Sequence, residues 1–136
     1  MTTKTTNKVT LAGFWPAHMD RIEARICNKL ISTIFDAGYS IQVNCGEVGD
    51  VFVPTTQSRQ LVQADTAATG MTIYCVMDTS PQHTNPGKAV KVGHVLLVHG
   101  NGTEIISDMS WPGSKPENEE IMETLTRPAS DLAETL

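Results

Sequence analysis

The sequence predicts an α+β fold, in which an antiparallel sheet of three to five strands carries a long N-terminal helix on one face and is followed by an acidic C-terminal helix. Three observations support this: a helical apolar stripe near the N-terminus, a series of short alternating segments after it, and a helix-start signal near the C-terminus. With 136 residues, 40% hydrophobic and 18% charged, the chain has the size and composition of one globular domain, spanning residues 1–136.

The predicted N-terminal helix covers residues 17–37. Its apolar positions recur every three or four residues, as on a buried helix face: Met19, Ile22, Ile26, Cys27, Leu30, Ile31, Ile34 and Phe35. Pro16 suits the first helical turn, and Gly38 suits the left-handed position just past a helix end. We expect the other face to be solvated surface, with Arg21, Glu23, Arg25 and Lys29.

Alternating apolar residues predict strands at 39–44, 71–77, 89–98 and 104–109, with a further strand at 48–53 that Pro54 ends. A short, weakly packed helix is expected at 58–68 and a loop at 78–87. The last two strands form a hairpin around Asn101-Gly102. A two-residue turn would pair His99 with Glu104, Leu97 with Ile106 and Val95 with Asp108, whereas a longer loop would shift all three pairs.

A capping box at Ser114-Lys-Pro-Glu117 predicts the start of the C-terminal helix. Ile121, Met122 and Leu125 give this helix an apolar edge, and Pro128 is expected to end it. We therefore expect residues 129–136 to form a mobile tail and residues 1–14 a flexible leader.

Cysteine usage and charge bear on the compartment and on partners. Cys27, Cys45 and Cys75 contain no Cys-x-x-Cys spacing and are expected to be small buried hydrophobes in a reducing, cytoplasmic environment. The net charge is −5, and most of it lies after residue 114. Scattered Lys and Arg argue against direct nucleic-acid binding, and the apolar runs are too short for a membrane span.

Two stretches carry a resemblance: Ala37-Gly-Tyr-Ser-Ile-Gln-Val-Asn-Cys-Gly-Glu47 and Gly93-His-Val-Leu-Leu-Val-His-Gly-Asn-Gly-Thr-Glu-Ile-Ile-Ser-Asp108. Together they resemble a family of small uncharacterised proteins of bacteriophages, prophages and related mobile elements. The chain departs from that pattern at Cys45, where the family has an acid, at His99, where it has an aromatic, and at Met109, where it has tyrosine or histidine. The resemblance implies a mobile-element context and supplies no catalytic residue.

The densest set of chemically active residues is His94, His99, Glu104 and Asp108. Residues five apart on a strand point to opposite faces, so the two histidines cannot share one metal. His99 with Glu104 is left as a polar site, either a surface pair or the centre of a small enzyme or metal-dependent hydrolase. We expect no cofactor, no metal and no nucleophile motif.

The acidic helix offers a partner site made of Glu117, Glu119, Glu120 and Glu123, with Trp111 as an anchor. These carboxylates either form a solvated helix face or imitate phosphates and engage a basic groove of a host protein. The sequence therefore favours a non-enzymatic accessory protein of a phage or plasmid that inhibits a host protein, such as a nucleic-acid-binding defence protein of the CRISPR or restriction type. The alternatives are the small enzyme and a self-associating, homodimeric or virion-associated protein.

Overall fold

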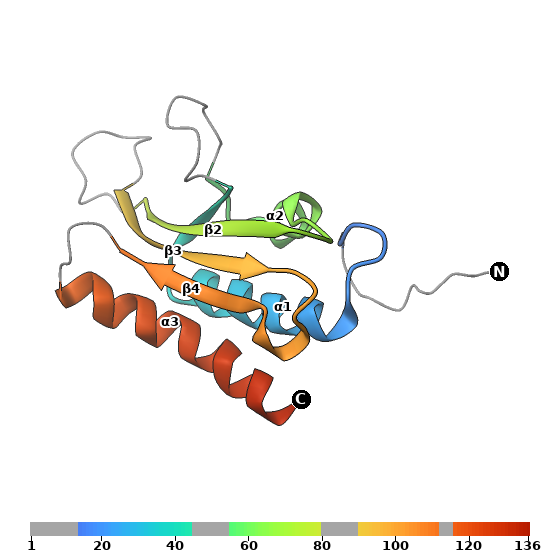
Figure 1. The fold of residues 1–136 in the computed structure, drawn as a ribbon. Helices are drawn as coiled ribbons and strands as arrows, with labels where there is room; N and C mark the ends of the chain where they lie inside the picture. Colours follow the sequence, from blue (N-terminus) through green and yellow to red (C-terminus); the bar gives the residue numbers. More distant parts are fainter. Residues whose placement is uncertain (1–13, 45–54, 80–89, 112–115) are drawn as a thin grey trace.

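The computed structural model describes residues 14–44, 55–79, 90–111 and 116–136 (Figure 1). Within them, the predicted α+β fold is confirmed: four antiparallel strands lie in the order β1-β2-β3-β4. The strands are β1 (Ser40–Val43), β2 (Met71–Asp78), β3 (Val90–Val98) and β4 (Ile106–Ser110). The helices are α1 (Arg21–Asp36), α2 (Arg59–Asp65), the 3-10 turn η1 (Gly102–Glu104) and α3 (Pro116–Thr135).

Helix α1 begins later than the sequence predicted. Asp20 caps its first turn by accepting a hydrogen bond from the backbone N–H of Glu23 at 3.0 Å, so the N-terminus of the helix is not at Pro16. An aspartate cap satisfies an N–H that proline merely lacks, which makes Asp20 the stronger start signal. Gly38, with φ +93°, follows the helix end as predicted.

The core lies between one face of the sheet and the helices α1 and α3 (Figure 1). Alternate strand residues, among them Ile41, Tyr74 and Val95, point into it and are fully buried. Helix α3 approaches β3 so closely that a Cβ at Gly93 would lie 2.6 Å from the Met122 sulfur and 2.6 Å from the Ser110 carbonyl oxygen. Gly93 is therefore the residue that lets α3 seat on the sheet.

The opposite face of the sheet carries an apolar strip along its middle strands. The strand register places Ile73 beside Leu96 and Met71 beside Val98 on this face. Met71 is 64% exposed, and the other three side chains are half-buried. We call these four residues the sheet strip.

Helix α2 docks on α1 through polar contacts rather than apolar bulk, which agrees with the predicted weak packing. Gln63 donates to the Asn28 side chain at 2.8 Å and accepts from the Phe14 backbone N–H at 2.7 Å. Arg59 donates to the Ser32 hydroxyl at 2.7 Å. Val62 supplies the buried apolar contact.

The β3–β4 hairpin is confirmed, but its loop is longer than two residues. The 3-10 turn η1 occupies positions 102–104, and β4 begins only at Ile106. Leu97 still pairs with Ile106, but a register shift places Asp108 opposite Leu96 and Met109 opposite Val95. The pairing of Val95 with Asp108, expected for a two-residue turn, is therefore wrong. The expectation that a longer loop would shift all three pairs is also wrong, because Leu97 keeps its partner Ile106.

Helix α3 continues through Pro128 to Thr135, so the predictions of a helix end at Pro128 and of a mobile tail at 129–136 are wrong. Proline removes one backbone hydrogen bond from a helix, a cost that burial of apolar side chains offsets. Ala129 is fully buried and Ala133 packs against the core, which holds the last turns in place.

Several predictions fall on other parts of the chain. Outside the described residues lie the leader up to residue 13, the strand at 48–53, most of the 78–87 loop and Ser114 of the capping box.

Cys27 is a free, buried thiol, as predicted. Cys75 is disulfide-bonded. Cys75 is buried, as predicted, but because it forms a disulfide the cysteines no longer argue for the reducing environment expected from the sequence.

Candidate functional site

The polar centre of the molecule is Glu23, which the sequence analysis assigned to solvated surface. Its side chain is only 1% exposed, so that assignment is wrong. Glu23 lies four residues before Cys27 and seven before Leu30, and therefore continues the buried stripe of α1. Ile22 takes the more exposed position, with 39% of its surface accessible. A buried carboxylate needs partners, and the β3–β4 loop supplies them.

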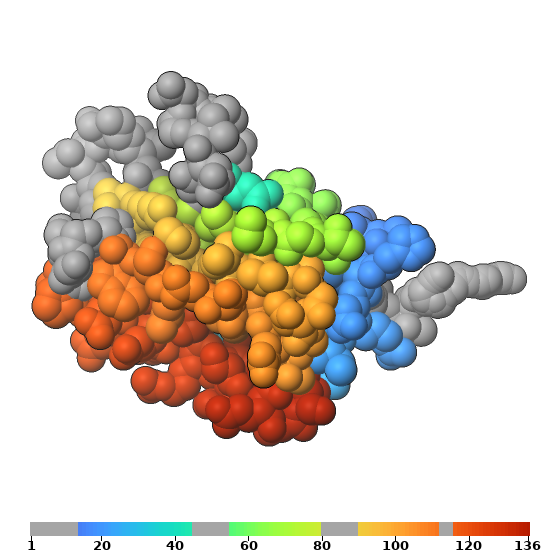
Figure 2. All heavy atoms as spheres, in the orientation of Figure 1, coloured from blue at the N-terminus to red at the C-terminus, as the bar shows by residue number. Residues whose placement is uncertain are grey.

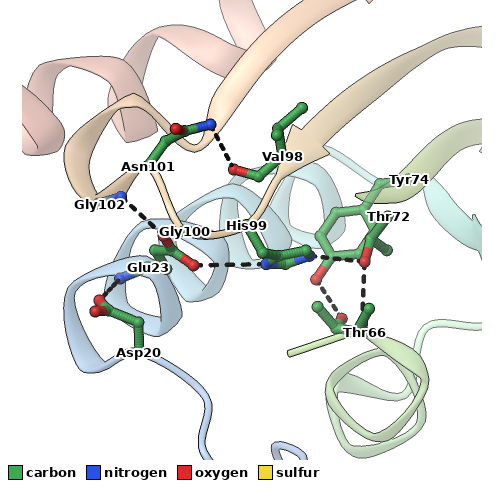
Figure 3. Close-up of polar contacts among 11 residues, drawn as sticks. Asp20, Glu23, Thr66, Thr72, Tyr74, Val98, His99, Gly100, Asn101 and Gly102 are labelled. Carbon is green, nitrogen blue, oxygen red and sulfur yellow. Dashed lines mark hydrogen bonds and ion pairs between the residues drawn. The ribbon is translucent and has the colours of Figure 1, made fainter. Parts of the chain in front are cut away.

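One carboxylate oxygen of Glu23 fixes this loop (Figure 3). Its Oε2 accepts the backbone N–H groups of Gly100 and Gly102, each at 2.8 Å. Both glycines have positive φ, +96° and +60°, a conformation that turns their N–H groups toward one anion at little steric cost. The Gly-Asn-Gly sequence thus serves as an anchor for Glu23 as well as a turn.

The other carboxylate oxygen faces His99 (Figure 3). Glu23 Oε1 lies 3.6 Å from His99 Nδ1, and these two buried atoms make no hydrogen bond within the described part of the chain. On the far side of the ring, Nε2 lies 2.8 Å from the hydroxyl of Thr72, which accepts the backbone N–H of Ala67 at 3.0 Å. A proton on Nδ1 would point at the carboxylate and leave Nε2 to accept from Thr72.

Glu23, His99 and Thr72 follow the carboxylate, imidazole and hydroxyl order of a hydrolase triad. A nucleophile must reach a substrate, and here the Thr72 side chain and the His99 ring have no exposed surface. The closed arrangement therefore ties α1 to β2 and to the β3–β4 loop. We call it the buried triad.

A second buried polar group adjoins the triad. Thr66 donates its hydroxyl to the Val62 carbonyl at 2.7 Å, so the Tyr74 hydroxyl, 2.6 Å away, donates to Thr66. Burial raises the pKa of Tyr74 well above its ordinary value, and the neighbouring Cys27 adds to the rise. Burial likewise raises the pKa of the Cys27 thiol to about 12, which makes it a poor nucleophile.

The predicted His99–Glu104 site does not form. His99 turns inward to Glu23, whereas Glu104 is exposed on η1, and no hydrogen bond or ion pair joins them. The longer loop separates the two residues. Sequence reasoning missed Glu23 and Thr72, although the position of Glu23 on the apolar stripe was a usable signal.

Glu104 instead lines an open cleft of about 640 Å³ between the β3–β4 loop and the end of α3. In Figure 2 the orange η1–β4 segment and the red end of α3 meet at the surface. The cleft is lined by Asn101, Thr103, Glu104, Ile106, Ser107, Ser130, Ala133 and Glu134. We call it the η1–α3 cleft.

The four predicted partner residues Glu117, Glu119, Glu120 and Glu123 are all exposed on α3. Asp131 and Glu134 are exposed on the same helix, with Arg127 as its single base. None of these six carboxylates makes an ion pair in the described part of the chain. We call them the acidic ridge. Trp111 is half-buried against the core and so is a core cap rather than an exposed anchor.

His94 and His99 point to opposite faces of the sheet, as predicted. His94 is on the face of the sheet that carries the sheet strip, with Nε2 3.0 Å from the Ser110 hydroxyl. Burial and the charge of Lys91 lower the pKa of His94, and Asp108 partly opposes them.

Comparison with protein-family models, curated proteins and solved structures finds no match to this chain. Among the described residues, no group of three or more His, Cys, Asp or Glu side chains is placed to hold a metal ion. None of the described helices is both long and apolar enough to cross a membrane.

Proposed function

We propose that the protein is a non-enzymatic accessory protein of a phage or plasmid that binds and inhibits a basic, nucleic-acid-binding host protein inside the cell. The observation that carries this proposal is the acidic ridge, which presents six exposed carboxylates on one helix without an ion pair among the described residues. The mobile-element context comes from the resemblance noted above, and CRISPR or restriction enzymes are the expected class of target.

The shape of the ridge suits such a partner. Glu117 and Glu134 are 17 positions apart on α3, which corresponds to about 26 Å at 1.5 Å per residue. Neighbouring carboxylates three or four residues apart have Cβ atoms about 5–6 Å from one another. Because the buried side of α3 packs on the sheet, the row is held on a rigid support and needs little ordering on binding.

The test begins with capture of partners from nuclease-treated host lysate, followed by binding measurements with the purified candidate. We compare E120Q/E123Q, which removes two ridge charges, with D36N/D65N, which removes two exposed charges elsewhere. We expect the ridge variant alone to weaken binding, by about tenfold if each lost contact contributes roughly 0.7 kcal/mol. The partner should also lose its bound DNA or RNA to the wild-type protein.

Equal weakening by both variants would indicate unspecific charge attraction and contradict the proposal. Binding that leaves the partner's nucleic acid in place would contradict the inhibition mechanism. Circular dichroism of the variants checks that the fold is kept.

The sheet strip favours a second candidate function, self-association through the face of the sheet opposite α1 and α3. An apolar strip on two central strands is suited to packing against its own copy about a twofold axis. We test it by measuring molar mass in solution over a hundredfold concentration range for the wild type, for L96E and for L61E, which adds the same charge on α2. A dimer lost only in L96E supports this candidate, and a wild-type monomer throughout excludes it.

A further inference from the structure

The η1–α3 cleft has the size of a ligand site and lies beside the acidic ridge. Its volume of about 640 Å³ falls within the range of roughly 300–1,000 Å³ that is usual for ligand pockets. One wall is the β3–β4 loop with η1, and the other is the last turns of α3. Two elements far apart in sequence thus meet to form a concave site.

The polar side chains that line the cleft are available to a ligand. Thr103, Glu104, Ser107, Ser130 and Glu134 make no side-chain hydrogen bond or ion pair in the described part of the chain. The lining contains two carboxylates, one from each wall, and no basic residue. Hydroxyl and carboxylate oxygens are acceptors, so the cleft is matched to a cationic group that donates several hydrogen bonds.

The apolar part of the lining narrows the choice of cation. Ile106 and Ala133 are half-buried at the cleft and offer contact to an aliphatic stem. Arginine combines such a stem with a planar guanidinium that has five N–H donors, enough to reach acceptors on both walls. An ammonium group offers three donors from one point and spans two walls less well.

The wall that carries Glu104 is held rigid from inside the molecule. Glu23 binds the N–H groups of Gly100 and Gly102, which flank the cleft residue Asn101. The Asn101 side chain donates to the Val98 carbonyl at 3.1 Å, which further fixes the loop. A preformed wall lowers the entropy that a ligand must lose on binding.

We infer that the η1–α3 cleft is the anchor pocket for one arginine side chain of the protein partner, gripped between Glu104 and Glu134. This inference rests on the proposed function, because it names the residue by which a basic partner would dock at the end of the acidic ridge. Glu23 is a positioning residue for the pocket.

The test is a titration of ¹⁵N-labelled full-length protein with acetyl-Gly-Arg-Gly-amide at fixed ionic strength, followed by amide chemical shifts. We expect saturable shifts at Thr103, Ser107, Ser130 and Ala133, with a dissociation constant in the millimolar range, on the order of −4 kcal/mol. A citrulline peptide, which is neutral and of nearly the same shape, should bind at least tenfold more weakly. A lysine peptide should bind more weakly than arginine, and free L-arginine no more tightly than the peptide.

Two variants localise the site. E104Q and E134Q should each lower the affinity for the arginine peptide by about threefold to tenfold, whereas D36N/D65N should leave this affinity unchanged. Shifts confined to residues 117–123, or equal affinity for the citrulline peptide, would overturn the inference.

The outcome is separable from that of the proposed function. Peptide binding in the cleft without any host partner would keep the pocket and remove the inhibitor role. A host partner whose binding is weakened by E120Q/E123Q but not by E104Q or E134Q would do the reverse.

Discussion

Replacing Glu23 is the sharpest test of the buried triad. Glu23→Ala removes the acceptor of two backbone N–H groups and the negative charge beside His99. Hydrogen bonds to a charged group contribute about 1.5–3 kcal/mol each. Because the glycine amides are only partly buried, we expect a total loss of about 3–5 kcal/mol in the free energy of unfolding.

Glu23→Gln separates shape from charge. The glutamine oxygen can still accept from Gly100 and Gly102, so this variant should lose only about 1–2 kcal/mol. Urea unfolding at constant pH gives both values, and hydrogen exchange should show faster opening of the two glycine amides. E104A, on the exposed side of the same loop, is the control and should stay within about 0.5 kcal/mol of the wild type. A loss below about 1 kcal/mol for Glu23→Ala would refute the anchoring role.

Four further predictions concern other parts of the fold. The pKa of Cys27 is raised to about 12 from an ordinary 9.0. The stability that its neutral thiol contributes is therefore fully present below pH 9 and falls as the pH rises toward 12, by at most about 1.4 kcal/mol per pH unit. The difference in unfolding free energy between the wild type and C27A, measured by urea unfolding, should shrink from pH 8 to 10, and a constant difference would contradict this prediction. A proton NMR titration should give His94 a pKa below the ordinary histidine value. K91Q should raise this pKa and D108N should lower it further. Opposite shifts would refute the assigned causes. G93A should lower the free energy of unfolding by about 1–3 kcal/mol through overpacking, as measured by thermal unfolding. Because the Ser110 carbonyl oxygen lies as close to the added Cβ as Met122 does, adding M122A should not restore wild-type stability. P128A should raise the free energy of unfolding by about 1–2 kcal/mol, because it restores one helix hydrogen bond. A lower free energy of unfolding would show that proline is needed inside α3.

Much of the fold follows from local patterns that the sequence displays openly. The stripe from Met19 to Ile34 and the alternation in β2 and β3 predicted a helix and two strands within a few residues of their observed bounds. Prediction of α3 failed at Pro128 because the rule used there was local. Burial of Ala129 and packing of Ala133 are long-range contacts, and they outweigh the hydrogen bond that proline removes.

The candidate site was harder to predict because its residues come from distant parts of the chain. Glu23 and Gly100 are 77 positions apart, and His99 and Thr72 are 27 apart. A charged residue on an apolar stripe has two readings, an exposed side chain or a buried one with partners, and the stripe alone does not choose between them. The choice becomes visible only when the partner is found, here a turn with two positive-φ glycines.

The buried triad and the η1–α3 cleft share one structural element, the loop from His99 to Glu104. Its inner side is bound by Glu23 of α1, and its outer side lines the cleft opposite Glu134 of α3. Weakening the inner contacts should therefore loosen the outer wall before it unfolds the protein, because two of the hydrogen bonds that hold the loop are those to Glu23, beside the ones made by Asn101 and by the loop backbone. Glu23→Gln, which keeps most of the stability, should accordingly weaken arginine-peptide binding by about twofold to fivefold with no contact to the ligand. If affinity stays unchanged while the Gly100 and Gly102 amides exchange faster, the order of this wall does not contribute to binding, and Glu104 and Glu134 alone determine it.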